Sequence, residues 1–224
     1  MSESTLHTEL KWLYSESNDQ IEKKVGNFII DIVKDDLLIE IQKINFSAIR
    51  NKIRTLLQKY KVELVHPIYQ DKWIINLDSQ LNKIIRRRLS PIHCSYIDIF
   101  EELISIPRMI CHPNFTIDIV LVQIEEIREN NGKGSWKRKG WSISDKKLLR
   151  LVERRKFNNP TDFLDFIPKD IKTPFTNLEL AKSLNKPLSF ARKVSYCLRK
   201  MEMLKTVGKR GNTLIFDFNN LKKL

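Results

Sequence analysis

The apolar residues near the start of the chain follow two different periods. In residues 4–14 they recur at helical spacing, as in Leu6 and Leu10, which predicts a helix. In residues 21–42 they form short runs rich in β-branched side chains, which predict strands. In residues 46–60 the helical spacing returns and gives one apolar stripe. The pattern therefore predicts a helix, three strands and a second helix, in that order.

The last two of these strands read as a β-hairpin. Two apolar runs flank the polar pair Asp35-Asp36, which suits a two-residue loop. Counting outward from this loop puts Asp31 directly opposite Glu40, and the period of two returns Gln42 to the same face. Opposed carboxylates repel each other and are costly to bury without a positive partner. The arrangement predicts a divalent cation, Mg²⁺ or Mn²⁺, between Asp31 and Glu40.

The pattern beyond residue 60 predicts a mixture of strands and helices. Strands are expected at residues 61–67, 72–77, 116–122, 205–207 and 213–218. Helices are expected at residues 97–110, 145–155, 161–167, 176–184 and 188–204. The last two helices, with the tight turn between them and the glycine-tipped ribbon that follows, are the pattern of a winged helix-turn-helix. A run of three arginines, residues 86–88, is expected in a loop, where it could contact phosphate.

Composition limits the class of protein. A length of 224 residues allows one large or two small domains. The sequence contains no run of 18 apolar residues, so no transmembrane helix is predicted. The first residues lack the layout of a signal peptide. The three cysteines are widely spaced and odd in number, which argues against a disulfide framework and favours the cytoplasm.

Charge is unevenly distributed along the chain. Residues 1–78 carry 11 Lys and Arg against 12 Asp and Glu, whereas residues 79–224 carry 29 against 15. A chain this basic indicates a polyanionic partner, and the second stretch would supply most of the non-specific attraction. A purely structural role fits this charge less well.

Two basic segments are candidate nucleic-acid contacts. The first is glycine-rich and interleaves cations with tryptophan, which suits phosphate binding combined with base stacking; its members are Trp136, Lys137, Arg138 and Lys139. The alternative is that its tryptophans pack against a domain surface. The second is the outward face of residues 188–204, opposite an apolar stripe; its members are Arg192, Lys193, Tyr196, Arg199 and Lys200, with Lys209 and Arg210 at the wing tip. The alternative there is a winged helix that contacts protein.

Asp31 followed by Glu40-Ile41-Gln42 on the next strand resembles the PD-(D/E)xK, or restriction-endonuclease-like, nuclease superfamily in its E-x-Q variant. The resemblance implies an α/β fold with an α-β-β-β-α-β core in residues 1–127. The whole chain resembles a bacterial group that pairs such a core with a C-terminal winged helix-turn-helix. The expected division is then a nuclease-like domain, a basic linker at residues 128–144, and a winged-helix domain at residues 145–224.

The resemblance also implies roles for single residues. Asp31 and Glu40 would hold the metal with the carbonyl of Ile41, and metal-bound water would attack a phosphodiester. Gln42 stands where the superfamily has lysine, so a fixed positive charge is missing. Further catalytic candidates are Glu9, as an extra carboxylate from the first helix or a solvated charge, and Lys52, as the missing cation or a surface lysine.

The expected function is therefore metal-dependent DNA cleavage, with duplex DNA as partner, no membrane, and a homodimer as a further expectation. The alternative is a non-catalytic DNA-binding regulator with a degenerate nuclease fold, which the loss of the motif lysine favours. The sequence leaves DNA and RNA both open.

Overall fold

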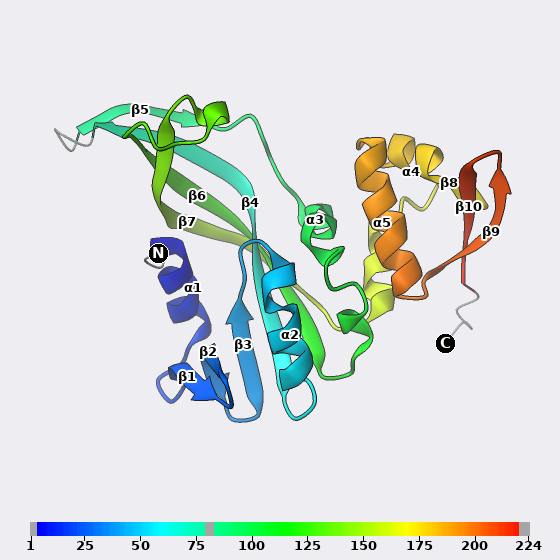
Figure 1. Cartoon of the computed structure of the whole chain (residues 1–224), viewed down its shortest axis with the longest axis horizontal. Helices are drawn as coiled ribbons and strands as arrows, with labels where there is room; N and C mark the ends of the chain where they lie inside the picture. Colours follow the sequence, from blue (N-terminus) through cyan, green and yellow to red (C-terminus); the bar gives the residue numbers. More distant parts are fainter. Residues whose placement is uncertain (1–3, 79–82, 220–224) are drawn as a thin grey trace. The chain divides into compact units, whose positions relative to one another are not determined.

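The computed structural model describes residues 4–78 and 83–219 and shows a mixed α/β protein with a sheet core and several helices (Figure 1). The elements of the first part are α1 (Thr5–Tyr14), β1 (Gln20–Val25), β2 (Phe28–Lys34), β3 (Leu37–Ile41), α2 (Phe46–Leu56) and β4 (Lys61–Asp78). The predicted order of helix, three strands and helix is confirmed. Within the described residues, no helix is both long and apolar enough to span a membrane.

The rest of the chain alternates long strands with short helical segments. Its elements are β5 (Lys83–Leu89), η1 (Tyr96–Ile99), α3 (Phe100–Leu103), η2 (Met109–Cys111), β6 (Phe115–Asn130), η3 (Trp136–Arg138), β7 (Trp141–Phe157), η4 (Pro160–Phe166), β8 (Phe175–Thr176), α4 (Asn177–Ser183), α5 (Leu188–Lys200), β9 (Leu204–Arg210) and β10 (Thr213–Phe218).

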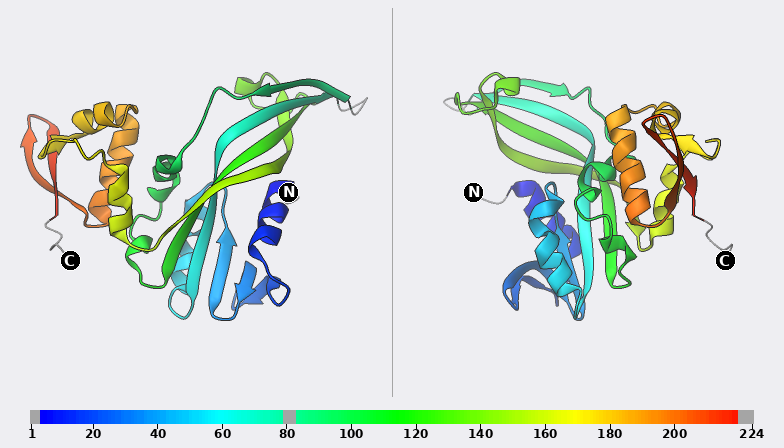
Figure 2. Two further views of the ribbon diagram at one scale, coloured as in Figure 1. Left: turned by 180° about the vertical axis from the view of Figure 1, so that it is seen from behind. Right: turned by 45° about the vertical axis from the view of Figure 1, so that its right-hand side comes forward.

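The strands form two sheets. The large sheet has seven strands in the order β1-β2-β3-β4-β6-β7, with β5 paired to β4 beyond that path. The long strands β4, β6 and β7 run side by side in Figures 1 and 2. The small sheet has the order β8-β10-β9, and Figure 2 shows α4 and α5 beside it.

The chain divides into two compact units. The first unit comprises Met1–Lys43, Val65–Tyr96 and Asp118–Arg155, and the second comprises Ile44–Leu64, Ile97–Ile117 and Lys156–Leu224. The first unit thus holds the hairpin and most of the large sheet. The second holds α2, α3, α4, α5 and the small sheet.

The first unit has its core between α1 and the large sheet. Leu6 and Leu10 of α1 are fully buried against Ile32, Ile39 and further aliphatic residues of the sheet. Helix α1 presents its apolar stripe to the sheet, and the charged residue Lys11 is buried as well. Helix α1 therefore supports both strands of the hairpin from one side.

The second unit has an aromatic core. Phe100 contacts Phe163 and Phe166 edge-on, with ring centroids 6.0 and 5.6 Å apart, and Phe157 stacks on Phe166 at 5.5 Å. Aromatic pairs at these distances stabilise a core beyond the area that they bury. This cluster anchors η4, which carries a capping box at Asn159.

Several predicted elements differ from the structure. The helix predicted at residues 145–155 is wrong, because this segment lies in strand β7. The two strands predicted at residues 61–67 and 72–77 are one strand, β4. The helix predicted at residues 97–110 is broken into η1, α3 and η2. The loop predicted around residues 86–88 is wrong as well, since these arginines lie in β5.

The predicted linker at residues 128–144 also has a different structure. It comprises the end of β6, a loop with the single-turn η3, and the start of β7. Pairing between the two strands supplies the backbone hydrogen bonds that this glycine-rich segment cannot make by itself. The glycines occupy the loop: a Cβ on Gly134 would lie 2.0 Å from the carbonyl oxygen of Trp141.

Candidate nucleic-acid interface and carboxylate hairpin

Strands β2 and β3 form the predicted hairpin in the predicted register. Three pairs join the strands, from Lys34 with Leu37 beside the loop to Ile32 with Ile39. Asp35 takes a φ of 44° in the loop, a conformation that Asp tolerates better than most residues. The last of these pairs, Ile32 with Ile39, is adjacent to Asp31 and Glu40, the two carboxylates of the expected metal site.

The Asp31 carboxylate is engaged by the protein itself. Its Oδ2 accepts a hydrogen bond of 2.7 Å from the main-chain N–H of Ile41, and its Oδ1 lies 3.2 Å from Nε2 of His7 on α1. A divalent cation bound to Asp31 would have to share or displace these contacts, because each carboxylate oxygen already has a partner. Ile41, expected to offer its carbonyl to the metal, thus contributes its N–H to Asp31.

Glu40 is buried, with 5 % of its surface exposed. Its neighbours Ile39 and Ile41 both belong to the apolar cluster around α1, so strand alternation directs the Glu40 side chain away from that cluster. Within residues 4–78 and 83–219, no group of three His, Cys, Asp or Glu side chains is placed to hold a metal ion. A cation held by the pair Asp31 and Glu40 stays a prediction.

The main chain of Gln42 is fixed between β3 and β4. Its N–H donates to the carbonyl of Val65 at 2.9 Å, and its carbonyl accepts a hydrogen bond of 2.8 Å from Nδ1 of His66. Because a carbonyl can only accept, Nδ1 of His66 carries the proton. His66 therefore positions the end of the expected motif.

The other two catalytic candidates have different surroundings. The Oε2 of Glu9 accepts a hydrogen bond of 2.6 Å from the N–H of Leu148 in β7, so this carboxylate is tied to the main chain of a strand. Lys52 lies on α2 in the second unit, and its role toward the hairpin stays a prediction. Sequence analysis missed His7, the α1 residue that contacts Asp31. Its position one turn before Lys11 gave no signal that it would face the hairpin.

Strand alternation separates the three consecutive arginines of β5. Arg87 turns to one side, where its Nε lies 3.1 Å from Glu125 and its guanidinium 5.3 Å from the centroid of the Trp73 ring. Arg86 and Arg88 turn to the other side and line a cleft. Strand alternation thus places two of the three arginines at the cleft and the middle one on the opposite face of β5.

The cleft gathers cations from segments far apart in the sequence, and we call it the arginine cleft. It has a volume of about 340 Å³ and is lined by Asn76, Arg86, Arg88, Arg128, Arg138, Lys139 and Trp141. The loop between β6 and β7 lies beside β5 in Figures 1 and 2. Among the residues that the structure describes, no carboxylate lines this cleft. In the described part of the chain, only Arg128 of these cations forms an ion pair.

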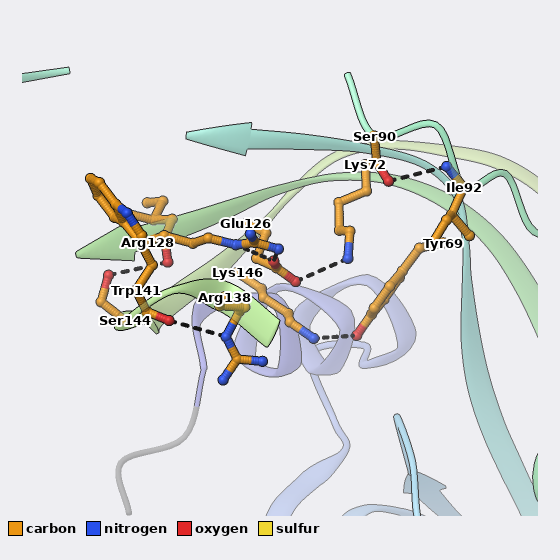
Figure 3. A network of polar contacts seen from close by, with 11 residues as sticks. Tyr69, Lys72, Ser90, Ile92, Glu126, Arg128, Arg138, Trp141, Ser144 and Lys146 are labelled. Atoms are coloured by element: carbon orange, nitrogen blue, oxygen red, sulfur yellow. Dashed lines mark hydrogen bonds and ion pairs between the residues drawn. The ribbon is translucent and has the colours of Figure 1, made fainter. Parts of the chain in front are cut away.

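That ion pair belongs to a network beneath the cleft (Figure 3). Glu126 of β6 is 2 % exposed and accepts hydrogen bonds from Arg128, whose Nε lies at 2.8 Å, and from Lys72 at 3.2 Å. Burial opposes ionisation of this carboxyl, but the contacts with Arg128 and Lys72 outweigh it, so the pKa of Glu126 lies below its ordinary value. One carboxylate is thus shared by two cations, which leaves the network positively charged.

A third cation, Lys146 of β7, approaches the same network. Its Nζ donates to the Tyr69 hydroxyl at 3.4 Å and lies 4.8 Å from the centroid of the Tyr69 ring (Figure 3). Burial lowers the pKa of Lys146, and the neighbouring cations Lys72 and Arg138 lower it further, against the opposing effect of Glu126. The same burial raises the pKa of Tyr69. An anion bound nearby would relieve this crowding of positive charge.

The predicted nucleic-acid contacts in the loop between β6 and β7 differ in exposure. Trp136 is 91 % exposed, whereas Trp141 is half-buried in the cleft, where its carbonyl accepts a hydrogen bond of 3.1 Å from Nε of Arg138. Lys139 is exposed at the cleft and has a φ of 50°. The side chain of Lys137 lies outside what the structure describes. An exposed Trp136 beside these cations has the form of a stacking platform.

The predicted face of α5 is less uniform. The apolar stripe is buried as expected, including Ala191, Val194 and Leu198. Of the outward residues, Lys193 pairs with Glu101 of α3, and Arg199 lies over the Phe216 ring at 5.4 Å. Two others, Tyr196 and Lys200, line a second cavity. Arg192 is the exposed cation of this face without such a contact in the described residues.

The expected wing tip is at the end of a strand. Arg210 pairs with Thr213, and Lys209 pairs with Leu214, across the ribbon of β9 and β10. Arg210 also lies 3.8 Å from Glu179 of α4. Both side chains are exposed, so they are available to a partner on the ribbon.

The family model that matches this sequence covers residues 4–158 and describes a domain of unknown function (DUF8091). This stretch is more than half of the chain. The chain belongs to the DUF8091 family. The matched DUF8091 segment runs from α1 to the end of β7 and contains both the hairpin and the arginine cleft, whereas α4, α5 and the small sheet lie beyond it.

A relative occurs in Treponema pallidum (strain Nichols), under the name uncharacterized protein. It is 27 % identical over 158 residues, which cover 70 % of this chain and 62 % of the relative. The chain thus spans less than two thirds of the length of the relative that it matches. No solved structure matches the chain.

Proposed function

We propose that this protein binds nucleic acid through the arginine cleft, with duplex DNA as the expected partner. The observation that carries the proposal is the meeting of Arg86 and Arg88 with Arg128, Arg138 and Lys139 in a cleft whose described lining residues include no carboxylate. Clustered cations without acidic partners repel one another, and a polyanion with regularly spaced phosphates removes that cost. The exposed Trp136 offers a surface for a base where the duplex ends or opens.

The charge balance beneath the cleft supports the same proposal. Glu126 is held by Arg128 and Lys72, so it cannot neutralise Arg86, Arg88 or Arg138 as well. Arg86, Arg88 and Arg128 project from strands β5 and β6, so phosphate groups would bind them without reordering of the main chain that carries them. Planar guanidinium groups also offer phosphate paired donors.

The test compares two faces of one strand. The double variant Arg86→Ala/Arg88→Ala removes both cleft-facing arginines, and Arg87→Ala is the matched control because it removes the same charge type on the other side of β5. Binding of a fluorescent duplex is measured by anisotropy over a range of salt concentrations. The double variant should reduce the slope of log K against log salt by about two, and the control should leave it nearly unchanged. Equal losses in both would overturn the assignment to the cleft.

The finer fold assignment is part of the proposal. The order α1-β1-β2-β3-α2-β4 agrees with a restriction-endonuclease-like core. In the second unit, β8, α4, α5 and the β9–β10 ribbon, with the sheet order β8-β10-β9, agree with a winged helix-turn-helix. Both assignments rest on element order and pairing, and both support a nucleic-acid partner.

A second candidate function is metal-dependent cleavage of the bound nucleic acid at Asp31 and Glu40. The nuclease-like element order and the hairpin register favour it. The contacts of Asp31 with Ile41 and His7 favour the non-catalytic alternative, because a cation would compete with them.

Cleavage and binding can be tested separately. Supercoiled DNA is incubated with wild type and Glu40→Ala in Mg²⁺ or Mn²⁺, and nicking is followed on gels. Catalysis at the hairpin requires that Glu40→Ala binds DNA with unchanged affinity but does not nick it. The Arg86→Ala/Arg88→Ala variant should nick poorly because it binds poorly. Absence of nicking by wild type in either metal, with binding intact, would leave the protein a binding protein.

A further inference from the structure

A second cation-lined cavity lies entirely within the second unit, between α2, the segment at residues 104–112, and α5. Its volume is about 540 Å³, within the range of cavities that hold small organic ligands. It shares no residue with the arginine cleft. We call it the α2–α5 pocket.

The rim of the α2–α5 pocket is positively charged. Arg50 and Arg54 come from α2, Arg108 from the intervening segment, and Lys200 from α5. No Asp or Glu of residues 4–78 or 83–219 lines the pocket. Among the residues that the structure describes, none of these four cations forms an ion pair. Arg54 donates to the Asn51 side chain at 3.1 Å, which fixes its direction without neutralising it. Four unpaired cations around one cavity favour an anionic ligand.

A histidine adds a neutral donor to the same rim. Nδ1 of His112 accepts a hydrogen bond of 3.2 Å from the N–H of Asn114, so Nδ1 is unprotonated and the proton of the neutral ring is on Nε2. The ring is half-buried in the pocket lining. His112 therefore brings to the lining a neutral N–H donor, Nε2, whose Nδ1 is already engaged.

The floor of the pocket is apolar and partly aromatic. Leu57, Ile106 and Pro107 are buried beneath it, and Met109 lies beside them. Tyr196 of α5 is half-buried in the lining, with the Nζ of Lys200 5.7 Å from its ring centroid. A bare phosphate ion would leave this floor exposed to water. A flat heterocycle would cover it and could stack on the tyrosine.

From the cationic rim and the apolar floor together, we propose that the α2–α5 pocket binds a nucleoside monophosphate group. The phosphate contacts Arg54, Arg108 and the neighbouring cations, and the base lies over the apolar floor against Tyr196. The inference does not depend on the arginine cleft. It assigns Tyr196 and Lys200 to a pocket, although the sequence placed them on a groove-facing helix surface.

The first experiment measures binding by calorimetry to the full chain. The probes are the four ribonucleoside 5′-monophosphates, with inorganic phosphate and adenosine as partial ligands. At least one monophosphate should bind at least about tenfold more tightly than either partial ligand, because only it meets both rim and floor. Equal affinity for inorganic phosphate would overturn the proposal in favour of a simple anion site. Failure of all four monophosphates to bind would overturn it outright.

The second experiment locates the site with variants. Arg54→Ala/Arg108→Ala should weaken nucleotide binding by at least about tenfold, and Lys59→Ala is the matched control because Lys59 is an exposed cation just beyond α2 that does not line the pocket. Tyr196→Phe should retain binding and Tyr196→Ala should weaken it. Unchanged binding in the arginine variant would place the ligand elsewhere.

Two further measurements separate this proposal from nucleic-acid binding at the cleft. Arg86→Ala/Arg88→Ala should bind the nucleotide like wild type, and loss of duplex binding in that variant leaves the pocket proposal intact. A free nucleotide and the 5′-phosphorylated end of a strand offer the same group. Competition by a 5′-phosphorylated trinucleotide, and not by its unphosphorylated form, would identify the strand end; competition by neither would identify the free nucleotide.

Discussion

In the arginine cleft, cations from β5, β6 and the β6–β7 loop meet on one surface. On α5, a comparable number of basic residues lies along one continuous helix, yet the structure divides them. Lys193 pairs with Glu101, Arg199 lies over Phe216, and Lys200 lines the α2–α5 pocket. Charges that are adjacent in sequence are thus dispersed, while charges some fifty residues apart in sequence are gathered.

The difference shows that tertiary pairing, and not local charge density, decides which cations of a basic segment are engaged within the protein. A helix face that looks free in sequence becomes a packing surface when another element approaches it, as α3 approaches α5. A strand face keeps its charges available when its neighbours contribute more charges of the same sign. We therefore expect different losses of duplex binding when the cations of the arginine cleft and those of α5 are removed.

The largest expected effect comes from removing each group of cations in turn. Arg86→Ala/Arg88→Ala/Arg138→Ala should reduce the salt slope of duplex binding by about three, whereas Arg192→Ala/Lys193→Ala/Arg199→Ala should reduce it by about one. The reason is that Lys193 and Arg199 already contact Glu101 and Phe216, whereas Arg192 makes no such contact among the described residues. Fluorescence anisotropy across salt concentrations measures both. If the α5 variant lost as much slope as the cleft variant, the contrast between the two surfaces would be broken.

Replacing Glu126 should cost stability without costing binding. Glu126→Gln removes the charge shared by Arg128 and Lys72, and the free energy of unfolding should fall by about 1.5–3 kcal/mol. Urea unfolding at pH 7 measures this loss, with duplex affinity equal to or above that of wild type. A stable variant that no longer binds DNA would mean that the network serves the ligand and not the fold.

Glu126 also makes the free energy of unfolding depend on pH in the acidic range. The pKa of Glu126 in the folded chain lies below its ordinary value of 4.5. Its contribution to stability is therefore complete above that value and is lost as the pH falls through the lower folded pKa. Between pH 7 and pH 3 the Glu126→Gln variant should lose less stability than wild type, as measured by urea unfolding at each pH.

Adding one methyl group to the loop should have a smaller effect. Gly134→Ala places a Cβ 2.0 Å from the carbonyl oxygen of Trp141, so the loop must open, at a cost of about 1–3 kcal/mol. Duplex affinity should fall because Arg138 and Lys139 move. Gly208→Ala is the control, since a Cβ there meets nothing within 4 Å. Similar unfolding midpoints for the two variants would show that the loop adjusts freely.

The smallest expected effect is at α5. Lys193→Ala breaks the ion pair with Glu101, whose side chain is half exposed, so the stability change should be at most about 1 kcal/mol. Thermal melting measures it. A larger loss would show that contact between α3 and α5 depends on this pair.

Sequence patterns within single elements predicted the register of one hairpin and the buried face of one helix. The register of β2 and β3 followed from the two-residue loop at Asp35-Asp36 and the β-branched runs beside it. The burial of Ala191, Val194 and Leu198 followed from helical spacing. In each case the pattern that carries the prediction lies within one short stretch of the sequence.

Long-range pairing caused the wrong predictions. Residues 148–152 carry leucine and valine at spacing that suits a helix, but the segment forms strand β7 beside β6, and Leu148 and Leu151 pack against the core around α1. Pairing with a formed sheet overrides such a local preference. For the same reason, no local pattern indicated that Arg86 and Arg138 would line one cleft, or that His7 would contact Asp31.

The arginine run of β5 has a consequence for how this strand can change during evolution. A one-residue slip in pairing exchanges the two faces of a strand, and the β4–β5 ladder already contains a register shift between Asn76 and Leu77. With a single arginine, such a slip would turn the charge away from the cleft. With three in a row, a slip in either direction still turns at least one arginine toward it. The repetition therefore makes the charge of the cleft tolerant of insertions and deletions that shift β5 along β4.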